Sequence, residues 1–507
     1  MELCTVKDIY RINSRGQYIN NFEFLNASET FPNKEILGRN SVYRYRHKQY
    51  TGIYNYGKRL HVKINGVEKE IPYKVISINY FKLITDKMTD LIFNNEINVK
   101  TGDIERDKQI YKLCDRLGVF DSFRKAFKLS TIYGDVGLKA HKGGVSVFSP
   151  LHVFKVVDKD DVNNTKAFAL YQFLTTKDND KETIGYIRFE IHFKSKIYEV
   201  VKQYSGNILS GSIGYPVEYR YKGRVIPKDG LWYDTGIDDC ELVQMACINQ
   251  EADGVYGESV YTSIQDIVYA LEQRVSVNQH LLDDSMMPFI IIGANSVVTE
   301  IDDEGNEELR VKLLDGKYLV DYDGSGSVKP IELGYNLTNS ENMISMMQGI
   351  LYELSEMGKT YLSGEYGGNI SEETLNNTIK SAIDKGNRLI TELYTIFKKI
   401  LYCLCRLNSI KVNMEDITIV FNVGRTDDDM KIAEICEKSI NSGMVSKRYL
   451  REKYLGFSVE QSDEEELQIE KEKNSMNNTQ VFTPLQENKE VDKDKDIITE
   501  DGKNKEQ

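Results

Sequence analysis

The chain has 507 residues, 40% of them hydrophobic and 28% charged, a composition that allows a sizeable core and about three domains of ordinary size. No stretch reaches the ~18 uninterrupted apolar residues of a membrane helix, and the first residues lack an apolar export signal, so we expect neither a membrane partner nor export. The net charge of −13, with acids and bases interleaved, disfavours tight nucleic-acid binding but permits a surface past which DNA moves without being held.

The cysteines and histidines show no metal-binding or disulfide pattern. Seven cysteines are scattered along the chain, and Cys403-x-Cys405 falls inside a helical pattern without a second pair to complete a zinc site. An odd, dispersed set is typical of reduced thiols in a cytoplasm. The six histidines form no HxH or HxxxH pair. We therefore expect no metal ion and no cofactor.

The first half of the chain mixes helical and strand-like patterns. Apolar residues at helical spacing predict a helix over Asn79 to Glu96, beginning at an asparagine N-cap, and a second helix from Ile110 to Asp135 with a break near Gly118. The second helix leads into a strand pair whose Gly143-Gly144 dipeptide is a hairpin signal. Alternation between residues 166 and 202 predicts further strands. These patterns predict the α+β class.

Two amphipathic helices flank a small, turn-rich β segment. In GVYGESVYTSIQDIVYALEQRVSVNQHLLDD the apolar residues from Ile264 to Leu282 line one face, Glu272 lies on the opposite polar face, and the apolar run PFIIIG follows. The second helix, from Asn339 to Gly358, carries a methionine-rich stripe. The short strands between them have too few apolar residues for a core of their own.

This arrangement favours a ring of identical subunits over a monomer. Strand edges left unpaired are a liability in a monomer. In a ring, small β units can complete their sheets with those of the neighbours, and the flanking helices can pack side by side around an axis. Such a head-to-tail interface is closed by rotation.

The last third of the chain is predicted to be helical and then disordered. A glycine-rich loop from Gly358 to Ile370 leads to the longest helix, for which Ser371 is the expected N-cap. Two shorter helices follow, over DDDMKIAEICEKSINSG and SKRYLREKYLG, each ended by glycine. From Ser462 the chain is acidic, and beyond about Asn474 it is polar and aperiodic, which predicts disorder.

Two short motifs suggest chemistry but lack its context. Gly358-Lys359-Thr360 ends like a phosphate-binding loop, yet the full pattern needs glycine where Glu353 stands and a strand leading into a helix. Asp427-Asp428-Asp429 could attract a metal ion, yet acids are normal at a helix N-terminus. We therefore predict that the protein is not an enzyme, with a nucleotide-using enzyme around Gly358-Lys359-Thr360 as an alternative.

Four passages occur in a characteristic order. They are NYFKLITDKMTDLIF, then STIYGDVGLKAHKGGVSVFSPLHVFKVVD, then the first amphipathic helix with PFIIIG, and finally the run from VFNVGRTDDDMK to DEEELQIEKEK. Together they resemble the portal proteins of tailed bacteriophages, the long-tailed type of Gram-positive hosts in particular. The resemblance extends over nearly the whole chain, to about Lys473.

The resemblance implies a structural protein of the virion. Such portal proteins form a ring, generally dodecameric, at one capsid vertex, through which DNA is packaged and later ejected. The implied partners are terminase, head-completion and adaptor proteins, major capsid and scaffolding proteins, and, transiently, double-stranded DNA. The implied location is the capsid vertex, and the host cytoplasm during assembly. Another virion structural or adaptor protein is the remaining alternative.

The resemblance also divides the chain and suggests which residues act. It implies an α+β portal-type ring subunit with a wing, a two-helix stem, a small β clip, a long wing helix and a helical crown. The divisions are a wing at 1–262, stem helices at 263–287 and 339–357, a clip at 288–338, a tunnel loop at 358–370, a long wing helix and strand at 371–425, a crown at 426–473 and a disordered tail at 474–507. The loop residues expected to face DNA are Lys359, Tyr361, Glu365, Tyr366 and Asn369. The residues expected at the seam between subunits are Ile264, Leu271, Val275, Met347, Leu351 and Leu354.

Overall fold

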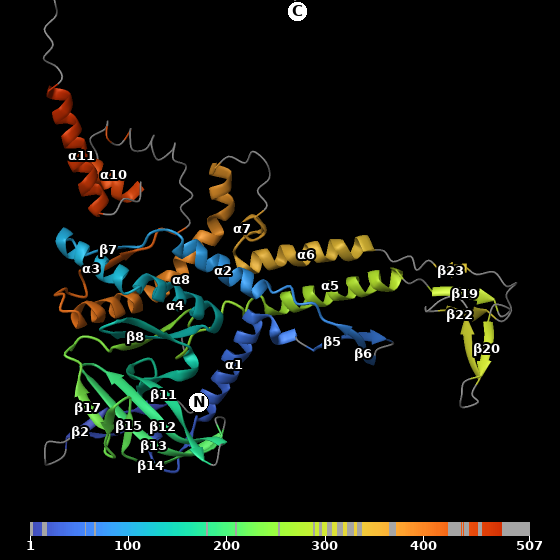
Figure 1. Ribbon diagram of the computed structural model, residues 1–507, viewed down its shortest axis with the longest axis horizontal. Coiled ribbons are helices and arrows are strands. Elements are labelled where there is room, and N and C mark those ends of the chain that lie inside the picture. Colours follow the sequence, from blue (N-terminus) through green and yellow to red (C-terminus); the bar gives the residue numbers. More distant parts are fainter. Residues whose placement is uncertain are drawn as a thin grey trace, which may run out of the picture. The chain divides into compact units, whose positions relative to one another are not determined.

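In the computed structural model the chain forms two compact units, Met1–Lys431 and Ile432–Gln507. Figure 1 labels many of the elements, which are numbered in chain order. The described residues are 4–12, 18–55, 57–64, 67–178, 181–207, 210–251, 254–286, 289–293, 297–301, 307–311, 318–321, 329–331, 337–364, 372–423, 438, 440, 446–454 and 459–478.

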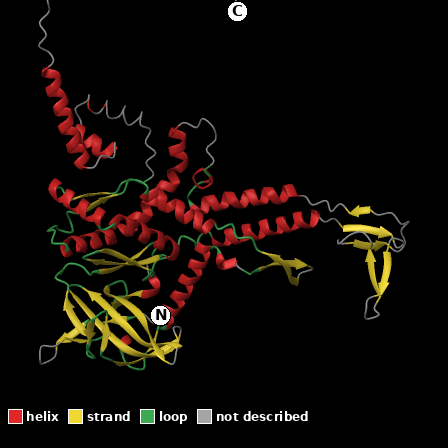
Figure 2. Ribbon diagram, viewed as in Figure 1, coloured by secondary structure: helices red, strands yellow, loops and turns green. Residues whose placement is uncertain are grey.

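An eight-stranded, mostly antiparallel sheet has β11 to β13 at its centre, which confirms the strands predicted between residues 166 and 202; its other strands come from outside that range (Figure 2). Side chains on its strands alternate between two environments. Phe189 and Ile191 pack into an apolar core with Phe31, whereas Arg188 and Glu190 project from the opposite face. The strands are β1 (Thr5–Val6), β10 (Val153–Asp158), β11 (Thr165–Asp178), β12 (Lys181–Phe193), β13 (Lys196–Asn207), β14 (Ser210–Pro216) and β4 (Thr30–Phe31), in that order, with β17 (Leu231–Asp234) paired to β13.

A smaller sheet has the order β18-β8-β9. The predicted hairpin is confirmed, because β8 (Asp135–His141) and β9 (Gly144–Phe148) are antiparallel and His141 pairs with Gly144 across the turn. The third strand, β18 (Val243–Cys247), pairs with the other edge of β8. This sheet therefore joins the region before the first amphipathic helix to a hairpin about a hundred residues earlier.

Several helices share one hydrophobic core with this smaller sheet. The predicted cap is confirmed, since the Asn79 side chain accepts a hydrogen bond from the Lys82 backbone N–H at 3.2 Å. The predicted break is also confirmed, because Gly118, with φ of 59°, separates two helices. The ring of Phe123, in the helix after Gly118, stacks on the ring of Phe397, in the helix Glu372–Leu407, with centroids 4.3 Å apart. Four of these helices are α2 (Tyr80–Phe93), α3 (Ile104–Arg116), α4 (Val119–Tyr133) and α8 (Glu372–Leu407).

Helix α1 (Lys34–Thr51) was not predicted from the sequence. Its buried side chains include Tyr43, Arg46 and Gln49, so aliphatic residues supply little of the buried face. Arg46 reaches across to Gln265, where Nη1 donates to Oε1 at 2.9 Å. A helix buried through aromatic and hydrogen-bonded side chains has no apolar stripe for periodicity to detect.

The remaining elements of the first unit are two long helices and several short strands and turns. They are η1 (Glu23–Leu25), η2 (Ile53–Asn55), η3 (Pro150–His152), α5 (Gln265–Met286), α6 (Leu337–Ser355) and α7 (Lys359–Ser363), and the pairs β2 (Tyr10–Ile12) with β3 (Tyr18–Asn20), β5 (Arg59–Ile64) with β6 (Val67–Lys74), β7 (Asn98–Lys100) with β24 (Thr418–Val420), β15 (Tyr219–Tyr221) with β16 (Arg224–Ile226), β20 (Val297–Ile301) with β21 (Glu307–Val311), and β19 (Phe289–Gly293) with both β22 (Tyr318–Asp321) and β23 (Lys329–Ile331).

The second unit contains α10 (Lys447–Tyr454) and α11 (Val459–Asn478). Arg448 forms an ion pair with Asp463 at 2.9 Å, which holds the two helices together. Helix α11 continues to Asn478, beyond the position at which disorder was predicted to begin. The helix predicted over residues 427–443 lies outside the described residues apart from 438 and 440, as does Ser371.

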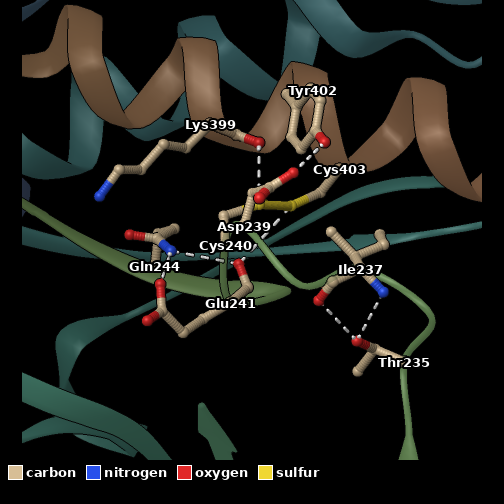
Figure 3. The surroundings of a disulfide bond; sticks show 9 residues. All are labelled: Thr235, Ile237, Asp239, Cys240, Glu241, Gln244, Lys399, Tyr402 and Cys403. Carbon is tan, nitrogen blue, oxygen red and sulfur yellow. Dashed lines mark hydrogen bonds between the residues drawn. A yellow bond between two sulfur atoms is a disulfide. The ribbon is translucent and has the colours of Figure 1, made fainter. Parts of the chain in front are cut away.

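A disulfide joins Cys240 and Cys403, which are 163 residues apart (Figure 3). It ties the loop between β17 and β18 to α8, and the Tyr402 hydroxyl donates to Asp239 at 2.7 Å beside it. The prediction of reduced thiols is therefore wrong for this pair, because the fold brings together cysteines whose spacing gives no sign of it. Among the described cysteines, Cys4, Cys114, Cys247 and Cys405 are free.

Candidate assembly and channel elements

Helices α5 and α6 lie side by side and antiparallel (Figure 1). The Ser340 hydroxyl donates to the Asn278 side chain at 2.5 Å, and one turn further along Arg274 Nη2 lies 3.6 Å from the sulfur of Met343. As numbers rise along α6, those of its partners on α5 fall. The two amphipathic helices predicted from the sequence are therefore confirmed as helices and packed as a pair.

The six residues expected at the seam fall into two groups. Ile264, Leu271 and Leu351 are fully buried inside the protomer, in the same core as α2 and α4. Val275 and Met347 are half-buried and Leu354 is 43% exposed. Only the second group is accessible to a neighbouring subunit without unfolding, so the seam stays a prediction that rests on the accessible residues.

Helix α6 presents an exposed apolar stripe. Met343, Met346, Ile350 and Leu354 are between 37% and 56% exposed. They follow each other at intervals of three or four residues, which places them on one face of the helix. Contiguous exposed apolar side chains often mark an interaction surface, so this stripe is a candidate contact between subunits.

Glu272 anchors the start of α5 to the body of the protein. The sequence placed Glu272 on the polar face of this helix, but the structure buries it completely. Its carboxylate accepts hydrogen bonds from the Tyr54 hydroxyl at 2.5 Å, the Asn55 amide at 2.7 Å and the Ile78 backbone N–H at 2.9 Å. Burial and the hydrogen bond to Glu272 raise the pKa of Tyr54, so the phenol remains a neutral donor. Glu272 therefore links α5, through buried hydrogen bonds, to the segments that contain Tyr54 and Ile78.

We expect Glu272→Ala to lower the free energy of unfolding by about 3 kcal/mol, because two buried donors and one partly buried backbone N–H would lose their acceptor. Asp266→Ala is the matched control, since Asp266 is an exposed carboxylate on the same helix and its loss should cost below about 0.5 kcal/mol. Urea unfolding followed by circular dichroism measures both. Equal losses for the two variants would contradict the anchoring role.

A tyrosine-glycine-aspartate step joins α4 to β8 and positions the segment that enters α5. A Cβ added at Gly134 would lie 2.6 Å from the carbonyl oxygen of Gly257, so the two chain segments touch through their backbones. The buried Asp135 carboxylate accepts from the Tyr43 hydroxyl at 2.5 Å and from the Gly257 N–H at 2.8 Å. Burial raises the pKa of Asp135, although these hydrogen bonds oppose the shift. The segment from Tyr133 to Asp135 therefore serves to pack the chain around Gly257 against the end of α4.

The predicted tunnel loop begins with a short helix. Lys359 is exposed, and Tyr361 donates from its hydroxyl to the backbone carbonyl of Lys87 on α2 at 2.9 Å. Leu362 is buried beside it. The other expected DNA-facing residues lie outside the described residues; they are Glu365, Tyr366 and Asn369.

Gly358-Lys359-Thr360 follows helix α6 and opens the short helix α7, so the strand that precedes a phosphate-binding loop does not precede this motif. Its position argues against nucleotide binding there. In the part of the chain that the structure describes, no group of three His, Cys, Asp or Glu side chains could hold a metal ion. The Asp427-Asp428-Asp429 cluster lies outside that part. Within the same part, no helix is long and apolar enough to cross a membrane.

A buried lysine that the sequence did not single out joins α8 to the end of α6. Lys385 donates to the Ser355 carbonyl at 2.9 Å and lies 3.5 Å from Glu356, which also pairs with Arg388 at 2.9 Å. Burial lowers the pKa of Lys385, although the charge of Glu356 opposes the shift. A lysine within an amphipathic pattern carries no sequence signal of burial.

A family model described as phage portal protein, SPP1 Gp6-like, matches residues 39–479. The chain belongs to this family of phage portal proteins. The match begins within α1 and ends one residue beyond α11, so it includes α5 to α8. The resemblance inferred from the four sequence passages is therefore confirmed, and the portal family is a structural one of the virion.

Two solved structures are similar to this portal protein. One is a chain from the neck of the empty GTA particle computed with C6 symmetry, at 10% identity and a TM-score of 0.38. The other is from the neck of the native GTA particle computed with C12 symmetry, at 9% identity and the same TM-score. Each alignment covers 73% of this chain and 88% of the other. No curated protein matches the chain.

Proposed function

We propose that this portal protein forms the ring-shaped channel at one vertex of the capsid, through which DNA is packaged and later ejected. In this role it docks terminase during packaging and head-completion or adaptor proteins afterwards, and contacts the capsid and scaffolding proteins. The observation that carries the proposal is the family match over residues 39–479. The packed pair α5 and α6, with an exposed apolar stripe on α6, supports it.

In this proposal we assign the predicted parts of the chain to these elements. The stem is α5 (Gln265–Met286) with α6 (Leu337–Ser355), each within two residues of the predicted bounds. Strands β19 to β23 fall in the clip, α8 is the long wing helix, and α10 with α11 belongs to the crown. The tunnel loop begins as α7 (Lys359–Ser363).

Ring assembly needs a surface on each subunit that a second copy covers. The stripe on α6 is apolar and exposed, and α6 itself lies beside α5, so the α5–α6 pair of one subunit could pack against that of the next. Burying a methionine or leucine completely contributes about 1.5–3 kcal/mol. Repeated around a closed ring, such contacts hold the subunits together through heterologous interfaces.

Electron microscopy of the purified protein tests the assembly. We expect rings with a central hole, and twelve subunits in each ring, as the resemblance to portal proteins implies. A monodisperse monomer or compact dimer at micromolar concentration would refute the ring. A ring alone does not separate a portal from an adaptor, so the second measurement is DNA packaging by heads assembled with and without this protein. Heads that package equally well without it would refute the portal role.

The tunnel loop can be tested separately from assembly. Lys359 is exposed at the start of α7, and reversing its charge should leave the protomer and the ring intact. We expect Lys359→Glu to reduce the rate or length of DNA packaged, because a carboxylate in the channel repels the phosphate backbone at short range. Lys142→Glu, at an exposed position in the turn between β8 and β9, is the matched control. Normal packaging by Lys359→Glu would make the loop a simple connector.

A further inference from the structure

A cavity of about 810 Å³ lies on the face of the large sheet opposite its apolar core. Its floor is formed by side chains of β11 and β12, among them Leu170, Arg188 and Glu190. The hairpin of β15 and β16 and the strands β8 and β9 contribute the walls. The cavity lies within the first unit and away from α5, α6 and α7, so the proposed channel does not use it.

Two buried glutamates hold the cations of this cavity in place. Glu199 is completely buried and receives the Nε of Arg188 at 2.6 Å and a guanidinium nitrogen of Arg224. Glu190, almost completely buried, receives Arg188 Nη2 at 2.8 Å and the ammonium group of Lys139. Charged side chains fixed by such contacts are preorganised for a ligand, because little rotamer entropy remains to be lost.

The walls of the cavity contribute the rings of Tyr221 and Tyr233 and the ammonium group of Lys222. The ring of Tyr221 lies over the Arg188 guanidinium at 4.5 Å, and its hydroxyl donates to Gln172 at 3.0 Å. Arg224, whose side chain is about half exposed, lies over the ring of Tyr233 at 5.3 Å. Lys222, in the hairpin turn, is exposed at the rim. Aromatic and cationic side chains therefore both line the cavity.

The charge of the cavity is opposite to that of the chain. The cluster contains four cations, on Lys139, Arg188, Lys222 and Arg224, against the two carboxylates of Glu190 and Glu199. Burial lowers the pKa of the neighbouring His192, although its hydrogen bond to Glu190 opposes the shift, so His192 adds no positive charge at neutral pH. An excess of positive charge in a protein of net charge −13 attracts an anionic partner.

We propose that this cavity is a docking site for an acidic segment of a partner protein, in which carboxylate residues alternate with apolar ones. Carboxylates spaced along such a segment would meet Lys222 and Arg224 at the rim, while the apolar side chains between them pack on Phe148 and Tyr233. A free phosphate fits less well, since entering deeply would bring its charge towards the carboxylate of Glu190 on the floor.

The test uses the full-length protein and a short labelled peptide in which aspartate and leucine alternate, with fluorescence anisotropy as the readout. We expect the peptide to bind and a lysine-leucine peptide not to bind. Lys222→Glu should weaken binding about tenfold, because it reverses a rim charge. Lys194→Glu, at an exposed position in the turn between β12 and β13, makes the same charge change outside the cavity and should bind as the unmodified protein does.

Three results would overturn the docking site. These are no binding of the acidic peptide to the unmodified protein, equal weakening by Lys222→Glu and Lys194→Glu, and displacement of the peptide by inorganic phosphate at equal concentration, which would assign the cavity to small anions. Thermal melting of both variants checks that the fold is kept; Lys222 is exposed in a turn, and no loss is expected. Failure here would leave the ring and channel untouched, since none of their elements lines the cavity.

Discussion

Arg188→Met is expected to lower the free energy of unfolding by about 3–5 kcal/mol, the cost of breaking a buried ion pair on one side. Arg188 joins Glu190 and Glu199, both almost fully removed from water. Burial by itself would raise the pKa of Glu190, but the hydrogen bond from His192 and the charges of Lys139 and Arg188 hold it well below the usual range. The carboxylate therefore stays charged at neutral pH and needs its partners.

The matched control is Arg124→Met, which removes an arginine paired with Asp90 at 2.6 Å where both side chains are more than 40% exposed. A surface pair of this kind contributes at most about 1 kcal/mol. Urea denaturation of the two variants and the unmodified protein gives the comparison. A loss below about 1 kcal/mol for Arg188→Met would mean that the glutamates are satisfied without the guanidinium.

Met346→Asp and Leu354→Asp are expected to convert rings into monomers while the protomer stays folded. Both side chains are exposed in the protomer, at 56% and 43%, so aspartate costs little there. In a ring, each would remove about 1.5–3 kcal/mol of burial per interface and place a charge in the seam. Sedimentation velocity measures the assembly, and circular dichroism checks the fold.

Leu271→Asp and Leu351→Asp provide the contrast, because both leucines are completely buried within the protomer. A charge there should unfold the protein or strongly lower its melting temperature, and any loss of rings would follow from that. Intact rings from both Met346→Asp and Leu354→Asp would show that the stripe on α6 is not part of the seam. The accessible pair thus separates assembly from folding, which the buried pair cannot do.

The sequence predicted those elements correctly whose buried side chains are apolar and whose signals lie within one short segment. The amphipathic stripes of α2, α5, α6 and α8 lie at helical spacing, and their largest buried members are aliphatic or aromatic. The asparagine before α2, the glycine between α3 and α4 and the Gly143-Gly144 hairpin act through the backbone of their own segment. Each of these signals is complete within about a dozen residues, so no distant partner is needed to interpret it.

The family assignment also came from the chain alone. The order of helices, short strands and acidic end carried the resemblance, and the family match from residue 39 to 479 supports it. By contrast, α1 was missed because its buried face contains Tyr43, Arg46 and Gln49, whose partners lie on α4, β8 and α5. Sequence periodicity detects only a stripe of apolar residues. Helix α1 is buried instead through hydrogen bonds and ring contacts between its polar or aromatic side chains and other elements.

Only the tertiary structure decided which polar residues are buried and which apolar residues stay exposed. Glu272 has the same chemistry as any surface glutamate of an amphipathic helix, and it is buried because Tyr54 and Asn55 bring donors to it from some 217 residues away. The exposure of Met346 likewise depends on what packs beside α6. A polar group is buried when its hydrogen bonds are replaced, and that replacement is a property of the partners, which local sequence does not record.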